Sequence, residues 1–200
     1  MALTEEQGNT LVRLARSTVD NFVRMTETPE DEVWDAPFLS EERGAFVTLK
    51  EGNGDLRGCI GFPYPTKKLG DAVVEAAMSA AAHDPRFPPV RPEELDGLLV
   101  EVSALTKPET LAYRSPKELP ALIRVGTDGL MVSAPGFGGL LLPQVATEYH
   151  MSSEEFISQT CLKAGLMPDA WLTGHLTVQR FQADVFGERS PRGQVERQLG

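Results

Sequence analysis

Apolar residues recur at helical spacing in three stretches of the chain. The first follows Thr4 and Gln7, whose spacing is typical of a capping box, and predicts an amphipathic helix over residues 4–25. The second is rich in alanine and predicts a helix over residues 69–83, which ends because a residue before proline disfavours helical geometry. A third helix is expected over residues 152–165.

Other stretches alternate apolar and polar residues with the two-residue period of β-strands. Residues 45–50 and 56–61 flank a turn of Gly, Asn and Asp and predict a hairpin. Residues 98–105 predict a further strand.

A second hairpin is expected from residues 130–132 and 140–142, and a last strand from residues 176–186. The last strand changes phase, which we interpret as a bulge near Arg180. Because the hairpins are explicit, we predict an α+β fold with an antiparallel sheet flanked by helices, rather than a doubly wound parallel sheet.

Composition and charge narrow the classes of function. The 200 residues carry a net charge of −10, which opposes generic nucleic-acid binding, because such binding neutralises phosphates with Lys and Arg. The sequence has no apolar run of roughly 18 residues that could span a bilayer, and its N-terminus is polar and acidic. We therefore expect a cytoplasmic protein without a membrane partner. The acidic residues 27–35 are expected to form a solvated face.

The two cysteines, Cys59 and Cys161, are far apart and should be free thiols in a reducing compartment. Neither they nor the three histidines have the spacing of a metal site, so we expect neither a metal nor a cofactor. Cys161 lies on the apolar stripe of its helix and is expected in the core.

The candidate chemistry centres on Arg57 and Cys59, which strict alternation places on one side of a strand. A cation near a thiol favours the reactive thiolate, so Cys59 could be a nucleophile with Arg57 beside it. Cys59 could equally be a small residue packed in a strand. Arg57 could form an ion pair with Glu101 or Asp84, or could bind an anion through its guanidinium.

Further residues around these two are candidates for ligand binding. Glycines at positions 58 and 61 would allow a close approach to the strand. Polar side chains from the later segments complete the candidate set, which is Arg57, Gly58, Gly61, Asp84, Arg86, Glu101, Gln144 and Lys163.

One hexapeptide carries a family resemblance. Leu56-Arg57-Gly58-Cys59-Ile60-Gly61 resembles the signature of the AMMECR-type domain family, named after the Alport syndrome, midface hypoplasia and elliptocytosis chromosomal region. Other matching stretches follow in the expected order, among them residues 84–88, 100–103, 139–145, 161–166 and 186–188.

The resemblance implies a single domain over residues 1–188. The mixed charge of residues 189–200 predicts a polar, frayed tail after it. The resemblance also implies two subdomains. The larger is built from both ends of the chain, the smaller is inserted from the middle, and a cleft lies between them.

Two functional hypotheses follow. In the first, the chain is a ligand- or partner-binding module. The family context implies that it acts with a radical-SAM protein and a Memo-like protein in a modification system, and an anionic small molecule is a further candidate ligand. In the alternative, the chain is a small-molecule enzyme that uses Cys59 as nucleophile and Arg57 to bind an anion or stabilise the thiolate.

Overall fold

The computed structural model of the chain describes residues 2–26 and 36–198. These residues form two compact units. Unit 1 contains residues 2–105 of the described chain and Asp184–Gln198, whereas unit 2 contains Thr106–Ala183. The larger unit is therefore built from both chain ends and the smaller one is inserted, as predicted. The acidic residues 27–35 lie outside the described residues.

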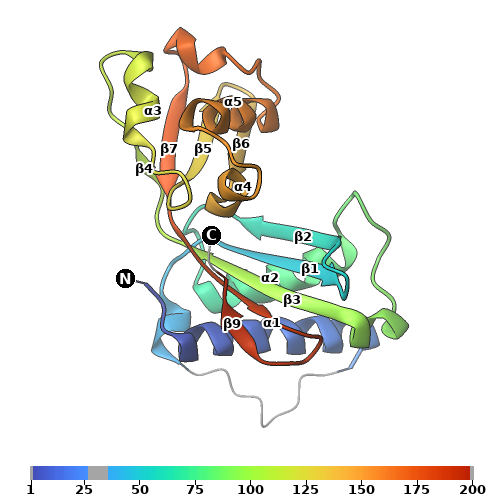
Figure 1. Cartoon of the computed structure of the whole chain (residues 1–200). Coiled ribbons are helices and arrows are strands. Elements are labelled where there is room, and N and C mark those ends of the chain that lie inside the picture. The colour runs from blue at the N-terminus through green and yellow to red at the C-terminus, as the bar shows by residue number, and fades with distance from the viewer. Residues whose placement is uncertain (1, 27–35, 199–200) are drawn as a thin grey trace. The chain divides into compact units, whose positions relative to one another are not determined.

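Unit 1 is an α+β unit with two long helices (Figure 1). In chain order its elements are α1 (Glu5–Arg24), a 3-10 turn (Pro37–Ser40), β1 (Ala45–Glu51), β2 (Leu56–Phe62), α2 (Leu69–Ala82), a second 3-10 turn (Pro92–Gly97), β3 (Leu98–Leu105), β8 (Ala183–Glu188) and β9 (Val195–Arg197).

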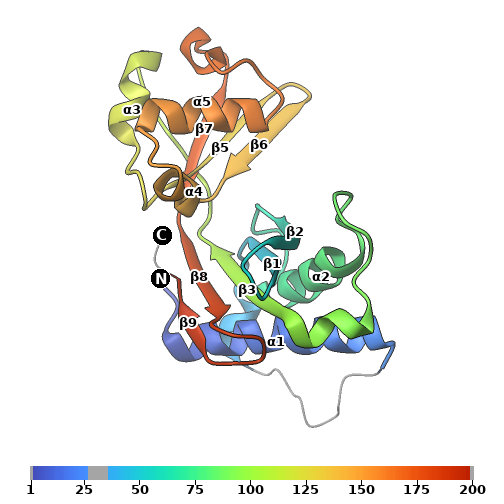
Figure 2. The same cartoon turned by 45° about the vertical axis from the view of Figure 1, so that its right-hand side comes forward.

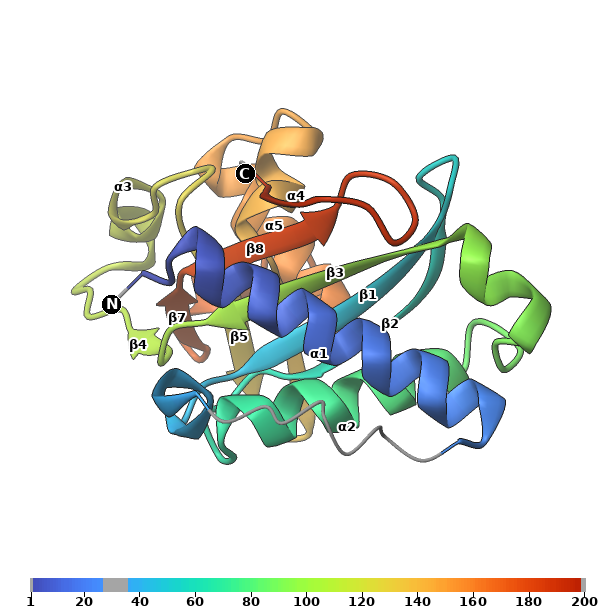
Figure 3. The same ribbon diagram turned by 90° about the horizontal axis from the view of Figure 1, so that it is seen from below.

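The five strands of unit 1 form one sheet in the order β2-β1-β3-β8-β9, so β2 lies at an edge. Both helices pack on the same face of this sheet (Figure 3). Val47, Leu49, Val100 and Val102 point toward the helices and are fully buried. Since side chains alternate along a strand, Thr48 and Glu101 lie on the opposite face.

Unit 2 is a smaller α+β unit with its own core (Figure 2). Its elements are β4 (Glu109–Thr110), a 3-10 turn (Pro116–Glu118), α3 (Leu119–Leu122), β5 (Gly129–Ala134), β6 (Phe137–Leu141), α4 (Pro143–Glu148), α5 (Ser153–Lys163), a further 3-10 turn (Ala170–Thr173) and β7 (Thr177–Phe181). The four strands form a sheet in the order β4-β7-β5-β6. Helix α5 packs on this sheet through Phe156, Ile157 and Cys161, which are fully buried.

The main elements predicted from the sequence are confirmed. Both capping boxes are present: Thr4 accepts a hydrogen bond from the backbone N–H of Gln7, and Ser152 accepts one from that of Glu155. Both hairpins form with antiparallel pairing. No helix in residues 2–26 or 36–198 is long and apolar enough to cross a membrane.

The prediction of a bulge near Arg180 is wrong. Strand β7 pairs with β5 without a break from Thr177 to Phe181. The next strand, β8, belongs to the sheet of unit 1, so the change of phase marks a passage from one sheet to the other at Gln182. The change of phase along residues 176–186 therefore comes from two consecutive strands in different sheets, not from a bulge within one strand.

The prediction of a frayed tail is also wrong for the described residues 189–198. Val195–Arg197 form β9, which pairs antiparallel with β8. Arg197 stabilises this return through an Nη1–Oδ1 contact of 2.8 Å with Asp184. The guanidinium of Arg197 also lies 4.5 Å from the ring centre of Phe186. A polar composition suggested fraying, whereas ion pairing holds the segment to the sheet.

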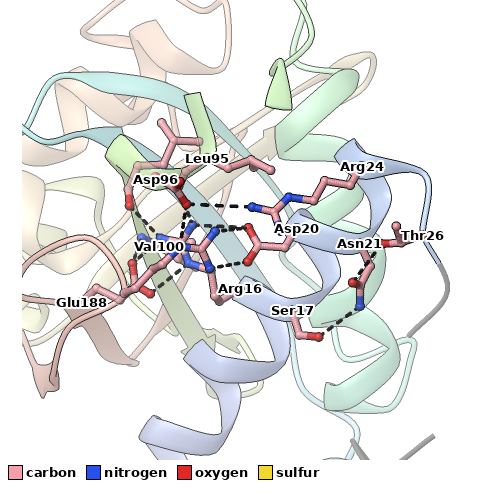
Figure 4. A network of polar contacts seen from close by, with 12 residues as sticks. Arg16, Ser17, Asp20, Asn21, Arg24, Thr26, Leu95, Asp96, Val100 and Glu188 are labelled. Atoms are coloured by element: carbon pink, nitrogen blue, oxygen red, sulfur yellow. Dashed lines mark hydrogen bonds and ion pairs between the residues drawn. The ribbon is translucent and has the colours of Figure 1, made fainter. Parts of the chain in front are cut away.

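A buried ion pair joins the two chain ends within unit 1 (Figure 4). Arg16 on α1 binds Glu188 at the end of β8 through both carboxylate oxygens, with an Nε–Oε1 distance of 3.0 Å. The guanidinium also donates to the carbonyls of Leu95 and Leu98. Oε2 of Glu188 accepts the backbone N–H of Val100 at 3.0 Å. All charged and backbone groups here are therefore paired with one another.

Further charged side chains surround this pair, and the nearest, Asp20, lies 3.8 Å from Arg16. Arg192 contacts Asp20 at 2.6 Å and Asp96 at 3.0 Å, so it connects the segment after β8 to α1 and to the 3-10 turn before β3. Arg24 lies near the same Asp96 at 3.9 Å. Exposed pairs of this kind are worth little individually, whereas removing one partner of the buried pair is costly because it strands a charge in the interior.

We predict that Glu188→Gln lowers the free energy of unfolding by about 3–5 kcal/mol, because it removes the main carboxylate partner of the buried Arg16 and leaves only the longer contact with Asp20 at 3.8 Å. The double variant Arg16→Met/Glu188→Met should recover only part of this loss, since the N–H of Val100 then lacks its acceptor. Urea unfolding monitored by circular dichroism measures these values.

The matched control is Arg189→Met, which breaks the exposed pair with Glu196 and should cost less than about 1 kcal/mol. Equal losses for Glu188→Gln and Arg189→Met would contradict the assigned role of the buried pair.

Candidate functional site

Cys59 lies on the edge strand β2, on the face of the sheet opposite the helices. The register places Cys59 opposite Thr48, and Thr48 opposite Glu101 on the next strand. The hydroxyl Oγ1 of Thr48 lies 3.2 Å from the sulfur of Cys59. Lys50 donates to Glu101 with an Nζ–Oε2 distance of 2.8 Å. The face therefore carries a thiol, a hydroxyl and an ion pair on three adjacent strands.

The backbone of Cys59 is held by two side chains from the loop after α2. Its N–H donates to Oδ2 of Asp84 at 2.8 Å, and its carbonyl accepts from Nη2 of Arg86 at 3.3 Å. Arg86 and Asp84 also bind each other, with an Nη2–Oδ2 distance of 2.7 Å. Together they satisfy the groups that an edge strand leaves unpaired, as a neighbouring strand would.

Asp84 is one of the ligand-binding candidates named from the sequence, and the structure gives it a defined position. Its side chain is only 2% exposed, whereas that of Arg86 is 48% exposed. Hydrogen bonds from Arg86 hold the pKa of the Asp84 carboxyl far below its usual range, and burial opposes this shift. Asp84 is therefore ionised wherever the fold is stable, and Arg86 presents its outer edge to solvent.

Arg57 does not form an ion pair with Glu101 or Asp84, so the prediction of these partners is wrong. Its guanidinium binds Glu94, with an Nε–Oε1 distance of 2.8 Å. It also donates to the carbonyl oxygens of Pro88 and Pro89. The physical reason is an irregularity in the hairpin: Gly58 pairs with Leu49 and Leu56 with Lys50, which leaves Arg57 as an extra residue in β2.

The glycines of the signature allow close packing. A Cβ atom on Gly58 would lie 2.3 Å from the carbonyl oxygen of Ala80 in α2. A Cβ atom on Gly61 would lie 2.3 Å from the carbonyl oxygen of Ala45 in β1. Both distances are too short for any side chain, so these glycines bring backbone segments together rather than making room for a ligand.

Burial raises the pKa of the Cys59 thiol above its ordinary value. The hydrogen bond with Thr48 and the charge of Arg86 act in the opposite direction without outweighing burial, while Glu101 and Asp84 add to the rise. Arg57 is not among the groups that shift this pKa, and neither is any histidine. The expectation that Arg57 lowers the pKa of the Cys59 thiol is therefore wrong. Cys59 is a neutral thiol at pH 7.

The structure brings seven of the candidate residues together in unit 1 and places two in unit 2. Gln144 lies in the first turn of α4, and Lys163 is the last residue of α5. Cys161 is fully buried in the core of unit 2, as predicted. Within the part of the chain that the structure describes, no group of three or more His, Cys, Asp or Glu side chains could hold a metal ion.

Sequence reasoning missed Thr48, Lys50 and Glu94. The first two could have been found, because residues 45–50 were predicted to pair with residues 56–61, and that pairing places Thr48 beside Cys59. Glu94 gave no such signal. Its position depends on the 3-10 turn Pro92–Gly97, which only the folded chain brings to Arg57.

Comparison with known proteins supports the family resemblance. The model of the family described as AMMECR1 matches residues 12–186. A protein of Methanothermobacter thermautotrophicus is 52% identical over 188 residues, which cover 93% of this chain and 96% of that protein. A protein of Thermofilum pendens is 49% identical over 205 residues, which cover 96% of this chain and 95% of that protein.

The fold is similar to that of a solved relative as well. The crystal structure of an uncharacterised protein from Pyrococcus horikoshii matches with a TM-score of 0.93 at 45% identity. The match covers 99% of each chain. The predicted α+β fold is therefore confirmed by an experimental structure of a similar protein.

We predict that Asp84→Asn lowers the free energy of unfolding by about 1.5–3 kcal/mol at pH 7, because the carboxylate binds Arg86 and the Cys59 backbone. The folded pKa of Asp84 lies below the unfolded value of about 3.9. Its stabilisation is therefore fully present above roughly pH 5 and is lost as the pH falls further. Urea unfolding of both proteins over this pH range measures the effect.

The difference between the wild type and Asp84→Asn should shrink at acid pH. Glu93→Gln serves as control, because Glu93 is exposed and no ion pair of Glu93 is found in the described parts of the chain. A constant difference between wild type and Asp84→Asn at all pH values would rule out this role of the Asp84 charge.

Proposed function

The chain belongs to the AMMECR1 family, and from this premise we propose that it is a binding module rather than a covalent catalyst. Its partners are a radical-SAM protein and a Memo-like protein, with which it forms a modification system. The observation that carries the proposal is the state of Cys59. The thiol is neutral, half-buried and hydrogen-bonded to Thr48, and no histidine is among the described groups that shift its pKa.

Covalent catalysis by a cysteine requires a thiolate and normally a base that is oriented beside it. Here burial opposes ionisation, and the hydroxyl of Thr48 occupies the position closest to the sulfur. The alternative role of Cys59 as nucleophile, with Arg57 stabilising its thiolate, therefore has little support. The guanidinium of Arg57 is bound to Glu94 and to backbone carbonyls, and so it fixes the loop after α2.

The charges around Cys59 favour a polar protein partner over a free small anion. Arg86 is already paired with Asp84, and Lys50 is already paired with Glu101. An incoming anion would have to compete with these carboxylates. A partner that carries charges of both signs can extend the two pairs without breaking them. Arg86 and Lys50 are accessible for this purpose, since 48% and 35% of their side-chain surfaces are exposed.

The proposal is tested by titrating the full chain with the Memo-like protein and, separately, with the radical-SAM protein of the same organism. We expect saturable binding of at least one of them by isothermal titration calorimetry. Lys50→Gln should weaken this binding about tenfold, and Cys59→Ser should leave it unchanged within about twofold. Thermal melts of each variant confirm that the fold is intact.

Lys117→Gln is the matched control, because Lys117 is an exposed lysine of unit 2 outside the candidate site. Its binding should equal that of the wild type. Absence of binding to both proteins would refute the proposal. Loss of binding in Cys59→Ser alone would instead make the thiol the essential group.

A further inference from the structure

Unit 2 contains a groove between α4 and α5 that plays no part in the proposed function. Its volume is about 360 Å³. Val145, Tyr149, Met151 and Leu162 form apolar walls, and Gln159 and Lys163 add an amide and an ammonium group. Gln159, Leu162 and Lys163 are spaced so that they share one face of α5. The groove therefore combines an apolar surface with one charged end.

The helix that forms one wall of the groove is firmly positioned. The opposite face of α5 is anchored by Phe156, Ile157 and Cys161, which are fully buried. The capping box between Ser152 and Glu155 fixes its first turn, directly after Met151. The α5 wall of the groove is accordingly in place before any ligand arrives, as is usual for binding sites of small molecules.

Two large apolar side chains of the groove remain in contact with solvent. Tyr149 is 70% exposed and Leu162 is 48% exposed. A compact apolar group placed between them would remove both surfaces from water, which is favourable. The hydrophobic walls therefore select an apolar body for the ligand.

The charge of the groove favours a ligand whose polar end is negatively charged. Among the described residues that line it, Lys163 is the only charged one and none is acidic. The described parts of the chain also place no carboxylate within ion-pairing distance of Lys163. The ammonium group can thus pair with an acid from outside, and the amide of Gln159 lies one helical turn away as a second hydrogen-bonding group.

We propose that this groove binds a small carboxylic acid with a compact apolar body. The carboxylate pairs with Lys163, and the apolar body lies between Tyr149 and Leu162. A small molecule fits better than a peptide segment, because the volume lies near the lower end of the range of roughly 300–1,000 Å³ for ligand pockets. This site is independent of the Cys59 face, so it extends the proposed function rather than resting on it.

The test uses hexanoate as probe and 1-hexanol as its uncharged counterpart. Both are titrated into the ¹⁵N-labelled full chain, and amide shifts are followed by NMR. We expect saturable shifts at Tyr149, Met151 and Leu162, with hexanoate binding about threefold more tightly than 1-hexanol, as an exposed ion pair allows. Added salt should reduce this preference, since it screens the charge of Lys163.

Variants separate the two parts of the ligand. Lys163→Met should abolish the preference for hexanoate, whereas Lys117→Met, which removes an exposed lysine outside the groove, should retain it. Leu162→Ser should weaken both probes. Retention of the preference in Lys163→Met, or equal affinity of both probes for the wild type, would overturn the proposal.

A pentapeptide with a C-terminal leucine tests the competing occupant. Its binding should be no tighter than that of hexanoate. Binding about tenfold tighter would show that the groove takes the end of a polypeptide chain, and the proposed small-molecule ligand would then be wrong.

Discussion

The ion pair between Arg16 and Glu188 is the contact on which unit 1 depends. These residues are 172 positions apart in the sequence, and the residues of the inserted unit 2 lie between them along the chain. The chain leaves unit 1 after Leu105 and returns at Asp184, so the sheet is complete only when β8 pairs beside β3. By binding α1, β8 and the backbone around β3 together, the pair makes both ends of the chain parts of one structure. The face of the sheet opposite the helices, with Thr48, Cys59 and Glu101, belongs to this same sheet.

The signature hexapeptide is explained largely by packing and edge chemistry. Gly58 and Gly61 allow backbone segments to approach, and Arg57 fixes the loop after α2 through Glu94 and two carbonyl oxygens. That loop in turn supplies Asp84 and Arg86, which bind the backbone of Cys59. The Cys59 side chain, by contrast, has Thr48 as its hydrogen-bonding partner. A motif that looks catalytic can thus be mainly a means of building an edge strand.

Local features of the fold could be predicted from the sequence because their causes are local. The capping boxes at Thr4 and Ser152 need residues three positions apart, and the hairpins need a turn between alternating strands.

The prediction that Arg57 and Cys59 share one side of a strand assumed strict alternation. It is wrong because one extra residue in β2 redirects the Arg57 side chain.

Contacts over long separations left no local signal. The partner of Arg57 lies 37 residues away, and that of Arg16 lies 172 residues away. The change of phase in residues 176–186 was visible, but only the two sheets reveal that β7 and β8 belong to different units. The choice of Glu94 over Glu101 or Asp84 depends on the same kind of tertiary placement. Sequence reasoning therefore singled out Arg57 and Cys59 as candidates, and it assigned Arg57 the wrong carboxylate partner.

The central claim is that Cys59 is a neutral thiol on a binding surface. Its most direct test is the pH titration of the Cys59 ¹³Cβ resonance in the full chain, with Cys161→Ser to leave a single cysteine. The account predicts a midpoint above the ordinary thiol pKa of about 8.5, and a further rise in Arg86→Gln, because Arg86 lowers the pKa. A midpoint below about 7 would show an activated thiolate and contradict the account.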